Sequence, residues 1–443
     1  LDSLAAINNV SQIRDIWYRP GLLTNHTVSV RGGGKSYGIY GSVAYTGNQS
    51  NRPGETHHTY KVNVRQDYQL SKRLDVFLIT DLTHVNAGSP RNIEVDNRFL
   101  PYQLFKDANG NPLSIPYVRQ LSDSTRLAFE QKSGISLDYN PLREYDYGYT
   151  KTDLIAARIT AGITARIVDG LSFSGVYGFF RTAEKTRSFD DSRSYIVRSE
   201  AAQFAVPAAV PGQLPTYHLP VTGGRYALSQ ATQRNWTVRN QLAYQRAWND
   251  QEHQISLLAG QEAQEQLLVS NQHLIRGYNE LLQTYPALDY KTLSTTGVSN
   301  PVMPNNGSRS LLPNAQPFTE TEAFVRFISY YGTAAYTYGN KYTISGSIRL
   351  DQSNLFGKDR SAQNKPVWSI GGRWDISEEK FMEQQAFNDL SLRVSYGLTG
   401  NSPVPGTAAS YDILEARTGS ALPGNTGMVI TTPANAALTW EST

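Results

Sequence analysis

The stretch Lys341–Asp351, with the sequence KYTISGSIRLD, decides the fold because its apolar and polar residues alternate without a break. An extended chain points successive side chains to opposite faces. One face carries Tyr342, Ile344, Gly346, Ile348 and Leu350, and the other carries Thr343, Ser345, Ser347, Arg349 and Asp351. A period of two over about ten residues predicts a β-strand. Ile155–Ile167 repeats this pattern, with Ile and Ala alternating against Arg, Thr and Gly.

Segments with the same alternation recur along the whole chain. Many exceed the length of about five or six residues that is usual for strands of soluble proteins. We predict about twelve strands, near 26–34, 36–47, 58–70, 74–86, 153–167, 171–183, 234–248, 252–264, 329–338, 341–351, 366–376 and 390–400.

The connections between these segments alternate between short and long. Tight links are predicted at 33–35, 71–73, 168–170, 249–251 and 339–340, with a longer one on the same side at 377–389. Long links fall at 87–152, 184–233, 265–328 and 401–437, and intermediate ones at 48–57 and 352–365. Outer-membrane barrels have short periplasmic turns and long external loops, so this rhythm is typical of them.

Composition agrees with a barrel and excludes several other classes of protein. Tyr is the commonest aromatic residue, at 27, and 35 Gly stand beside 3 Met and no Cys. Without Cys, disulfides, thiolate catalysis and Cys-based metal sites are excluded. The net charge of +3 is spread along the chain, which argues against nucleic-acid binding. No apolar run is long enough for a transmembrane helix, and no signal peptide is recognisable.

We therefore predict an all-β fold, an antiparallel transmembrane β-barrel with long extracellular loops. Its outer surface needs an apolar band bordered by aromatic residues. Residues predicted to lie on that surface or near its rims are Tyr336, Tyr338, Tyr342, Trp368, Trp374 and Tyr396.

Several stretches resemble the SusC/RagA class of TonB-dependent transporters, in the same order along the chain. Lys341–Met382 resembles a barrel hairpin of that class, and FNDLSLRVSYGLTGNSPVPG at Phe387–Gly406 is similar to the strand and loop that follow. Further resemblances lie at Leu100–Leu113, Asp169–Phe179, Arg193–Ala205, Asn235–Trp248 and Gln254–Glu262. Gln352 and Leu355 depart from the residues that the family often has there, Gly and Arg.

The resemblance implies a barrel of 22 strands, preceded by a signal peptide, a TonB-contacting segment and a plug domain. We therefore expect residues 1–443 to be a partial barrel domain from which those parts and the remaining strands are missing. The closing LTWEST at Leu438–Thr443 is expected to begin another strand. The implied function is import of oligosaccharides or peptides across the Gram-negative outer membrane, with TonB-supplied energy and a SusD-like surface lipoprotein as partner.

Six basic residues are predicted to face the barrel lumen: Lys61, Arg65, Arg158, Arg166, Arg349 and Arg393. They occupy the polar positions of their alternating segments. One interpretation pairs them with carboxylates of the wall or plug. The other makes the lumen basic, which would help polar or anionic cargo to pass.

Motifs that would indicate enzymes or cofactors have simpler interpretations. Gly32–Ser36 imitates a phosphate loop, but Ser29 stands where the motif needs Gly. Asp107–Asn111 imitates a calcium loop with the wrong acidic spacing, and Asn109-Gly110 predicts a tight turn. His57 and His58 are expected at a solvated loop end, and Glu378-Glu379 at a solvated turn. We predict no catalytic residues, no metal and no cofactor.

Two other functions remain open at this stage. A passive porin-like or adhesive barrel has the same strand pattern but needs no plug. A soluble secreted carbohydrate-binding β-protein would bury the Ile/Ala stripe of Ile155–Ile167 against a second sheet, whereas the barrel exposes it to lipid.

Overall fold

Twelve antiparallel strands form one sheet in the computed structural model, which describes residues 6–91, 100, 102–115, 119, 121–313, 317–359, 363–382, 389–401, 411–418, 426–439 and 441–442. The strands are β1 (Leu22–Gly33), β2 (Tyr37–Gln49), β3 (Thr56–Ser71), β4 (Leu74–Pro90), β5 (Gly148–Val168), β6 (Leu171–Asp190), β9 (Gly224–Trp248), β10 (His253–Tyr278), β13 (Phe318–Tyr338), β14 (Tyr342–Ser353), β15 (Val367–Asp375) and β16 (Ser391–Leu398). Each predicted strand is confirmed by one of these.

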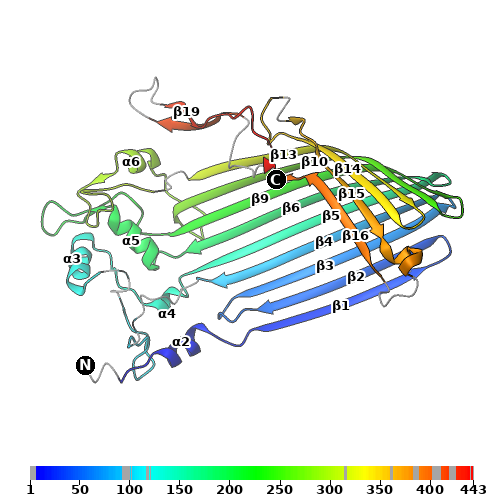
Figure 1. Ribbon diagram of the computed structural model, residues 1–443. Helices are drawn as coiled ribbons and strands as arrows, with labels where there is room; N and C mark the ends of the chain where they lie inside the picture. The colour runs from blue at the N-terminus through cyan, green and yellow to red at the C-terminus, as the bar shows by residue number, and fades with distance from the viewer. Residues whose placement is uncertain are drawn as a thin grey trace.

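Neighbours in the sequence are neighbours in the sheet, from β1 at one edge to β16 at the other. Figure 1 shows this order as a colour gradient across one curved sheet, with the short connections gathered at one end. Because outer-membrane barrels have short turns on the periplasmic side, we call this the periplasmic end and the opposite one the external end. Backbone geometry fits the tight turns: Gly339 and Asn340 both have positive φ, of 59° and 57°.

The α-helices of the described residues lie at the external end (Figure 1). They are α2 (Val10–Trp17), α3 (Asp123–Ser133), α4 (Pro141–Glu144), α5 (Tyr195–Gln203) and α6 (Tyr290–Thr295). Two-residue strand pairs join them in the loops: β7 (Ala205–Val206) with β8 (Thr216–Tyr217), and β11 (Val298–Ser299) with β12 (Arg309–Ser310). Among the described residues, no helix has the length and apolarity to span a membrane.

The remaining elements follow β15. The 3-10 helices η2 (Ile376–Glu378) and η3 (Lys380–Met382) lie in the connection to β16, and β18 (Ile413–Thr418) pairs with β19 (Thr426–Thr432). Parts of the predicted links 377–389 and 401–437 lie outside the described residues. Within LTWEST, β20 (Glu441–Ser442) pairs antiparallel with β17 (Gly400–Asn401), which directly follows β16. The expected start of another strand therefore has its first backbone pairs.

The register divides the sheet into two faces, because residues that pair directly across strands point to the same side. The apolar face includes the stripe of Ile155–Ile167, whose members Ile155, Ile159 and Ile167 keep 49%, 46% and 45% of their surface exposed. The stripe is therefore not packed against a second sheet, and the soluble-protein interpretation is wrong. Tyr336, Tyr338, Tyr342, Trp368, Trp374 and Tyr396 all point to this face, as predicted.

Buried hydrophobic side chains lie mainly in the external loops. One cluster joins Trp17, Phe105, Ile115 and Tyr139, and a second joins Phe204, Leu219, Leu293, Val298 and Leu312. Residues from three different long connections meet in these clusters, so the loops pack together as a layer. We call this the loop layer.

Candidate functional site

The face opposite the apolar stripe, which we call the polar face, carries all six basic residues predicted from the sequence. In the strand register, Arg158 of β5 lies opposite Asp81 of β4 and Phe180 of β6, without an ion pair to Asp81. Continuing the register from strand to strand brings Lys61, Arg65, Arg166, Arg349 and Arg393 to the same face as Arg158. That this face lines the lumen stays a prediction for each of them.

Three of the six form ion pairs with carboxylates of the wall. Arg65 binds both carboxylate oxygens of Asp67 at 2.8 Å, and Arg349 binds both oxygens of Asp351 at 2.8 and 2.9 Å. Arg166 Nη2 lies 3.3 Å from Asp75 Oδ2. These three agree with the interpretation in which the wall neutralises its own charge.

The other three have no carboxylate partner among the described residues. The Arg158 guanidinium lies 5.0 Å from the centre of the Phe180 ring, while Lys61 and Arg393 make no ion pair there. A cation over an aromatic face is stabilised without being neutralised. Of the six, Lys61, Arg158 and Arg393 are therefore the residues that could help this face to attract anions.

Another ion pair on the same face, between Arg239 of β9 and Glu262 of β10, was not predicted from the sequence. Both residues alternate correctly in their segments, so their face could have been predicted. Their contact depends on the register between two strands, which alternation alone does not define.

A polar pocket lies at the external end of the polar face, with a volume of about 430 Å³. Its walls come from the ends of β2 to β5 and the short link between β2 and β3: Asn48, Ser50, Glu55, Thr56, His57, Ala87, Gly88, Ser89, Thr150 and Thr152. The volume lies within the range of about 300–1,000 Å³ that is common for ligand sites. Most of these side chains offer hydrogen-bond donors and acceptors, and the pocket has apolar surface as well.

The link beside this pocket is held by residues outside it. Arg19 donates from its backbone N–H to Asn51 O at 2.7 Å and from Nε to Ser50 O at 3.1 Å. The Tyr145 hydroxyl donates to Pro53 O from the loop between β4 and β5. The pocket rim is therefore tied to the loop layer.

A buried ionic network connects the loop layer to the wall. Arg91 Nη1 lies 3.1 Å from Glu144 Oε2 and 3.6 Å from Asp190 Oδ1, and Arg198 Nη2 lies 3.6 Å from Glu144 Oε1. Glu144 Oε1 also accepts a hydrogen bond from the Tyr195 backbone N–H at 2.6 Å. Burial raises the pKa of Glu144, although the nearby arginines oppose that shift.

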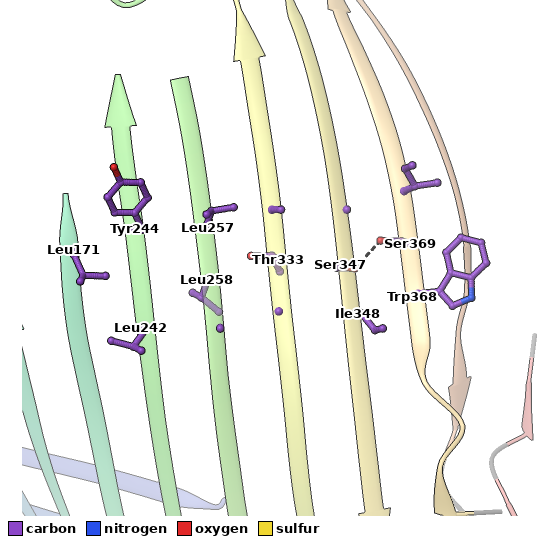
Figure 2. Close-up of a pocket in the computed structure, with 15 residues that line it drawn as sticks. Leu171, Leu242, Tyr244, Leu257, Leu258, Thr333, Ser347, Ile348, Trp368 and Ser369 are labelled. Carbon is purple, nitrogen blue, oxygen red and sulfur yellow. Dashed lines mark hydrogen bonds between the residues drawn. The ribbon is translucent and has the colours of Figure 1, made fainter. Parts of the chain in front are cut away.

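The apolar face contains a shallow groove of about 660 Å³ (Figure 2). Its floor is formed by small residues of β10, β13 and β14: Ala259, Gly332, Ala334 and Gly346. Figure 2 shows Leu242, Leu257, Ile348 and Trp368 around it on neighbouring strands. The only hydrogen bond drawn joins Ser347 Oγ to Ser369 Oγ at 2.7 Å, on the polar face. The groove suits hydrocarbon, not a polar cargo.

The sequences that imitate a phosphate loop and a calcium loop both form turns. Gly34 N–H donates to Tyr37 O in a tight turn that leads into β2, not into a helix. The Asn109-Gly110 turn is confirmed, since Gly110 has a φ of +84° and its N–H donates to Asp107 O at 3.1 Å. The described residues contain no group of His, Asp and Glu that could hold a metal ion.

His57 and His58 are the second and third residues of β3, directly after the link from β2, and His57 is exposed, as expected for a loop end. His58 Nδ1 also lies 2.9 Å from the Tyr45 hydroxyl. The expectation for Glu379 was wrong, because Glu379 accepts hydrogen bonds from Lys341 Nζ, the Tyr342 hydroxyl and Trp374 Nε1. Contacts from neighbouring strands cannot be seen in a local motif.

The fold and its surfaces define the class of protein. The sheet has an exposed apolar face with aromatic residues at its borders, and a polar face opposite it. Its short connections lie at one end and its long ones at the other. These are the features of an outer-membrane β-barrel. The protein therefore belongs in the outer membrane.

Comparison with known proteins finds relatives among the TonB-dependent receptors. The chain is 24% identical over 404 residues to TonB-dependent receptor P39 of Formosa agariphila, covering 89% of this chain and 32% of the relative. It is 33% identical over 78 residues to TonB-dependent receptor SusC of Bacteroides thetaiotaomicron, covering 17% of this chain and 8% of that protein. No protein-family model matches the sequence.

The solved structure of the RagAB peptide importer in its closed-closed state has the same fold, with a TM-score of 0.71 at 17% identity. The match covers 97% of this chain and 42% of that one. The chain is similar in sequence to TonB-dependent receptors, SusC among them, and it spans about a third or less of the curated relatives it matches. These relatives are named as receptors and an importer, not as enzymes.

Proposed function

We propose that this chain forms part of the wall and the external loops of an active importer for oligosaccharides or peptides. The observation that carries the proposal is the polar pocket at the external end of the polar face, whose rim is tied to the loop layer through Tyr145. Cargo bound there would have a hydrophilic surface to follow toward the periplasm. Relatives named TonB-dependent receptors support an active mechanism.

Both cargo classes fit the chemistry of the pocket. Amide, hydroxyl, carboxylate and imidazole groups from Asn48, Thr152, Glu55 and His57 hydrogen-bond to sugars and to peptide backbones alike. The similar RagAB structure is described as a peptide importer, which favours peptides for that protein. Uptake of both labelled classes by the same cells decides between them here.

The proposed partners follow from the same family. A SusD-like surface lipoprotein would cover the loop layer, and TonB would supply the energy for import. Packed loops suit this role because a preformed surface loses little conformational entropy on docking. Co-purification of a surface lipoprotein with the full-length receptor from native membranes tests the first partner.

The pocket is tested with two adjacent substitutions in the full-length receptor. Asn48 points to the polar face and lines the pocket, whereas Gln49 points to the apolar face. Asn48→Trp fills part of the pocket and is expected to lower uptake about tenfold or more, and Gln49→Trp is the matched control. Equal uptake by both variants and the unmodified receptor would overturn the pocket assignment.

Energy dependence separates active import from a passive barrel. Collapsing the proton gradient with a protonophore is expected to stop accumulation of the labelled cargo while leaving surface binding intact. A passive porin-like barrel would continue to equilibrate cargo under the same treatment, and that result would reject active import.

A further inference from the structure

The apolar face has an unusual charged cluster near its external border. Following the register places Arg181 of β6, Arg234 of β9, Glu265 of β10 and Arg326 of β13 on the face that otherwise meets lipid. On the described strands, the apolar face between this cluster and the residues next to the periplasmic turns carries no other charged side chain. We call these four residues the arginine cluster.

The cluster has one negative charge for three positive ones. Glu265 Oε2 accepts a hydrogen bond from Arg326 Nε at 2.8 Å, and Glu265 Oε1 lies 3.7 Å from Arg234 Nη2. Arg181 has no carboxylate partner in the described part of the chain. The cluster therefore keeps a charge of about +2 when all four groups are ionised.

The geometry of the arginine cluster shows that its excess positive charge is not neutralised within the cluster. Arg181 and Arg234 are direct Cα partners across the β6–β9 pair, and like charges in that position repel. The side chains of Arg234 and Arg326 remain 54% and 61% exposed, whereas that of Glu265 is 10% exposed. Glu265 already contacts Arg234 and Arg326. The exposed arginine side chains can therefore bind an anion from outside the protein.

The height of the cluster corresponds to a lipid headgroup layer. Arg181, Arg234 and Arg326 lie 10, 14 and 12 residues from the periplasmic ends of their strands at Leu171, Trp248 and Tyr338. A transmembrane β-strand needs about 9–11 residues to cross the hydrocarbon. The neighbouring aromatic side chains Phe179 and Trp236 share the apolar face, as expected at a membrane border.

The groove of Figure 2 lies below the cluster on the same strands and the same face. Ala259 is six residues from Glu265 along β10, and Gly332 is six residues from Arg326 along β13. Six residues span about 20 Å of strand, or about 14 Å of depth at a tilt of about 45°. That depth is close to half of the hydrocarbon core of about 30 Å.

We propose that the arginine cluster and the groove together form a binding site for a phosphate-bearing lipid of the outer leaflet. Arginine forks would bind the phosphate oxygens in pairs, neutralising the excess charge. The acyl chains would run along β10 and β13 into the groove. A free phosphate ion would satisfy the arginines but leave the groove without an occupant.

The site is tested with purified full-length receptor in nanodiscs, using lipopolysaccharide as the probe. Lipopolysaccharide from which the phosphates have been removed and inorganic phosphate are the comparison ligands. The proposal expects saturable retention of the intact lipid, at least tenfold weaker retention of the dephosphorylated lipid, and no competition by millimolar phosphate. Complete displacement by inorganic phosphate would instead assign the site to a free ion and reject the lipid.

Variants localise the binding. Arg181→Gln is expected to weaken retention about tenfold, since it removes one charge-assisted contact, and Arg181→Gln with Arg326→Gln is expected to abolish it. Arg187→Gln, six residues farther out on the same face of β6, is the matched control and should bind as the unmodified receptor does. Arg181→Lys keeps the charge and should retain part of the binding.

Folding is monitored separately, by the heat-dependent gel mobility of the barrel. Undiminished lipid retention by the folded double variant would overturn the proposal. Transport is not measured in any of these arms, so their outcome does not depend on whether the proposed cargo is correct.

Discussion

The wall and the loop layer of this protein are stabilised in opposite ways. Side chains such as Val28, Ile348 and Val394 on the wall remain 76%, 55% and 66% exposed, whereas Phe105 and Phe204 in the loop layer are fully buried. The wall relies on backbone hydrogen bonds between strands and on lipid as its apolar partner. The loop layer lies in water and needs a hydrophobic core of its own. The two regions of the chain are therefore stabilised for different solvents, lipid for the wall and water for the loop layer.

Removing one apolar side chain from each region tests this difference in stabilisation. Phe204→Ala in the loop layer is expected to destabilise that layer by about 3–5 kcal/mol, because it leaves a cavity among Leu219, Leu293 and Leu312. Ile159→Ala on the exposed stripe is the control and should cost the wall far less. Limited proteolysis of the external loops measures the first, and the heat-dependent gel mobility of the barrel the second.

Rapid loop cleavage in Phe204→Ala with an unchanged barrel transition would show that the two regions are independently stable. Equal loss of barrel stability in both variants would mean that the loops and the wall unfold as one unit. That result would contradict the separate stabilisation of the two regions.

The second test places the same charge on each face of one strand. Ile348→Arg on the apolar face of β14 should cost about 2–4 kcal/mol in a bilayer, since the charge would lie near the middle of the membrane. Ser345→Arg on the polar face of the same strand should cost little. Urea unfolding in lipid vesicles gives both values, and similar costs for the two variants would reverse our assignment of the faces.

Features that depend on residues close together in the sequence could be predicted, and features that depend on contacts between distant residues could not. The twelve strands needed only local alternation, and they are confirmed. Their external ends were underestimated: β9 begins at Gly224, not near 234, because alternation weakens where both faces leave the membrane.

The helices of the loop layer were missed, although capping residues precede three of them, α3, α4 and α6. The Ser122 side chain caps α3 by accepting from Thr125 N–H, and Gly134 ends that helix with a φ of 66°. The contacts of Glu144 with Arg91 and Arg198 span about 50 residues in the sequence. No pattern within a single segment indicates such contacts.

A third test separates the neutralised arginines of the polar face from the unpaired ones. Lys61→Gln with Arg158→Gln is expected to lower uptake of anionic cargo two- to fivefold and to leave neutral cargo unaffected, because neither residue has a carboxylate partner among the described residues. Arg349→Gln leaves Asp351 without its bidentate partner, so it should reduce stability more than selectivity. Radiolabelled uptake and thermal melting distinguish these effects.

Unchanged uptake of anionic cargo in the folded double variant would return Lys61 and Arg158 to a purely structural role. A stronger effect from Arg349→Gln on cargo choice would contradict the distinction between paired and unpaired bases.

The smallest expected effect concerns the periplasmic border, where Glu379 links the β15–β16 connection to β14. Hydrogen bonds from Tyr342 and Lys341 lower the pKa of Glu379 from 4.5 to about 2. A depressed carboxyl pKa stabilises the fold fully above the ordinary value, and that contribution disappears as the pH falls from about 4.5 toward 2. Glu379→Gln removes the charge at every pH, so the difference in melting temperature from the unmodified receptor should shrink across that interval. Glu378→Gln, on the exposed neighbour, is the control and should change the melting temperature at pH 7 far less than Glu379→Gln does. A constant difference between pH 7 and pH 2.5 would mean that the hydrogen-bond geometry, not the charge of Glu379, holds this connection.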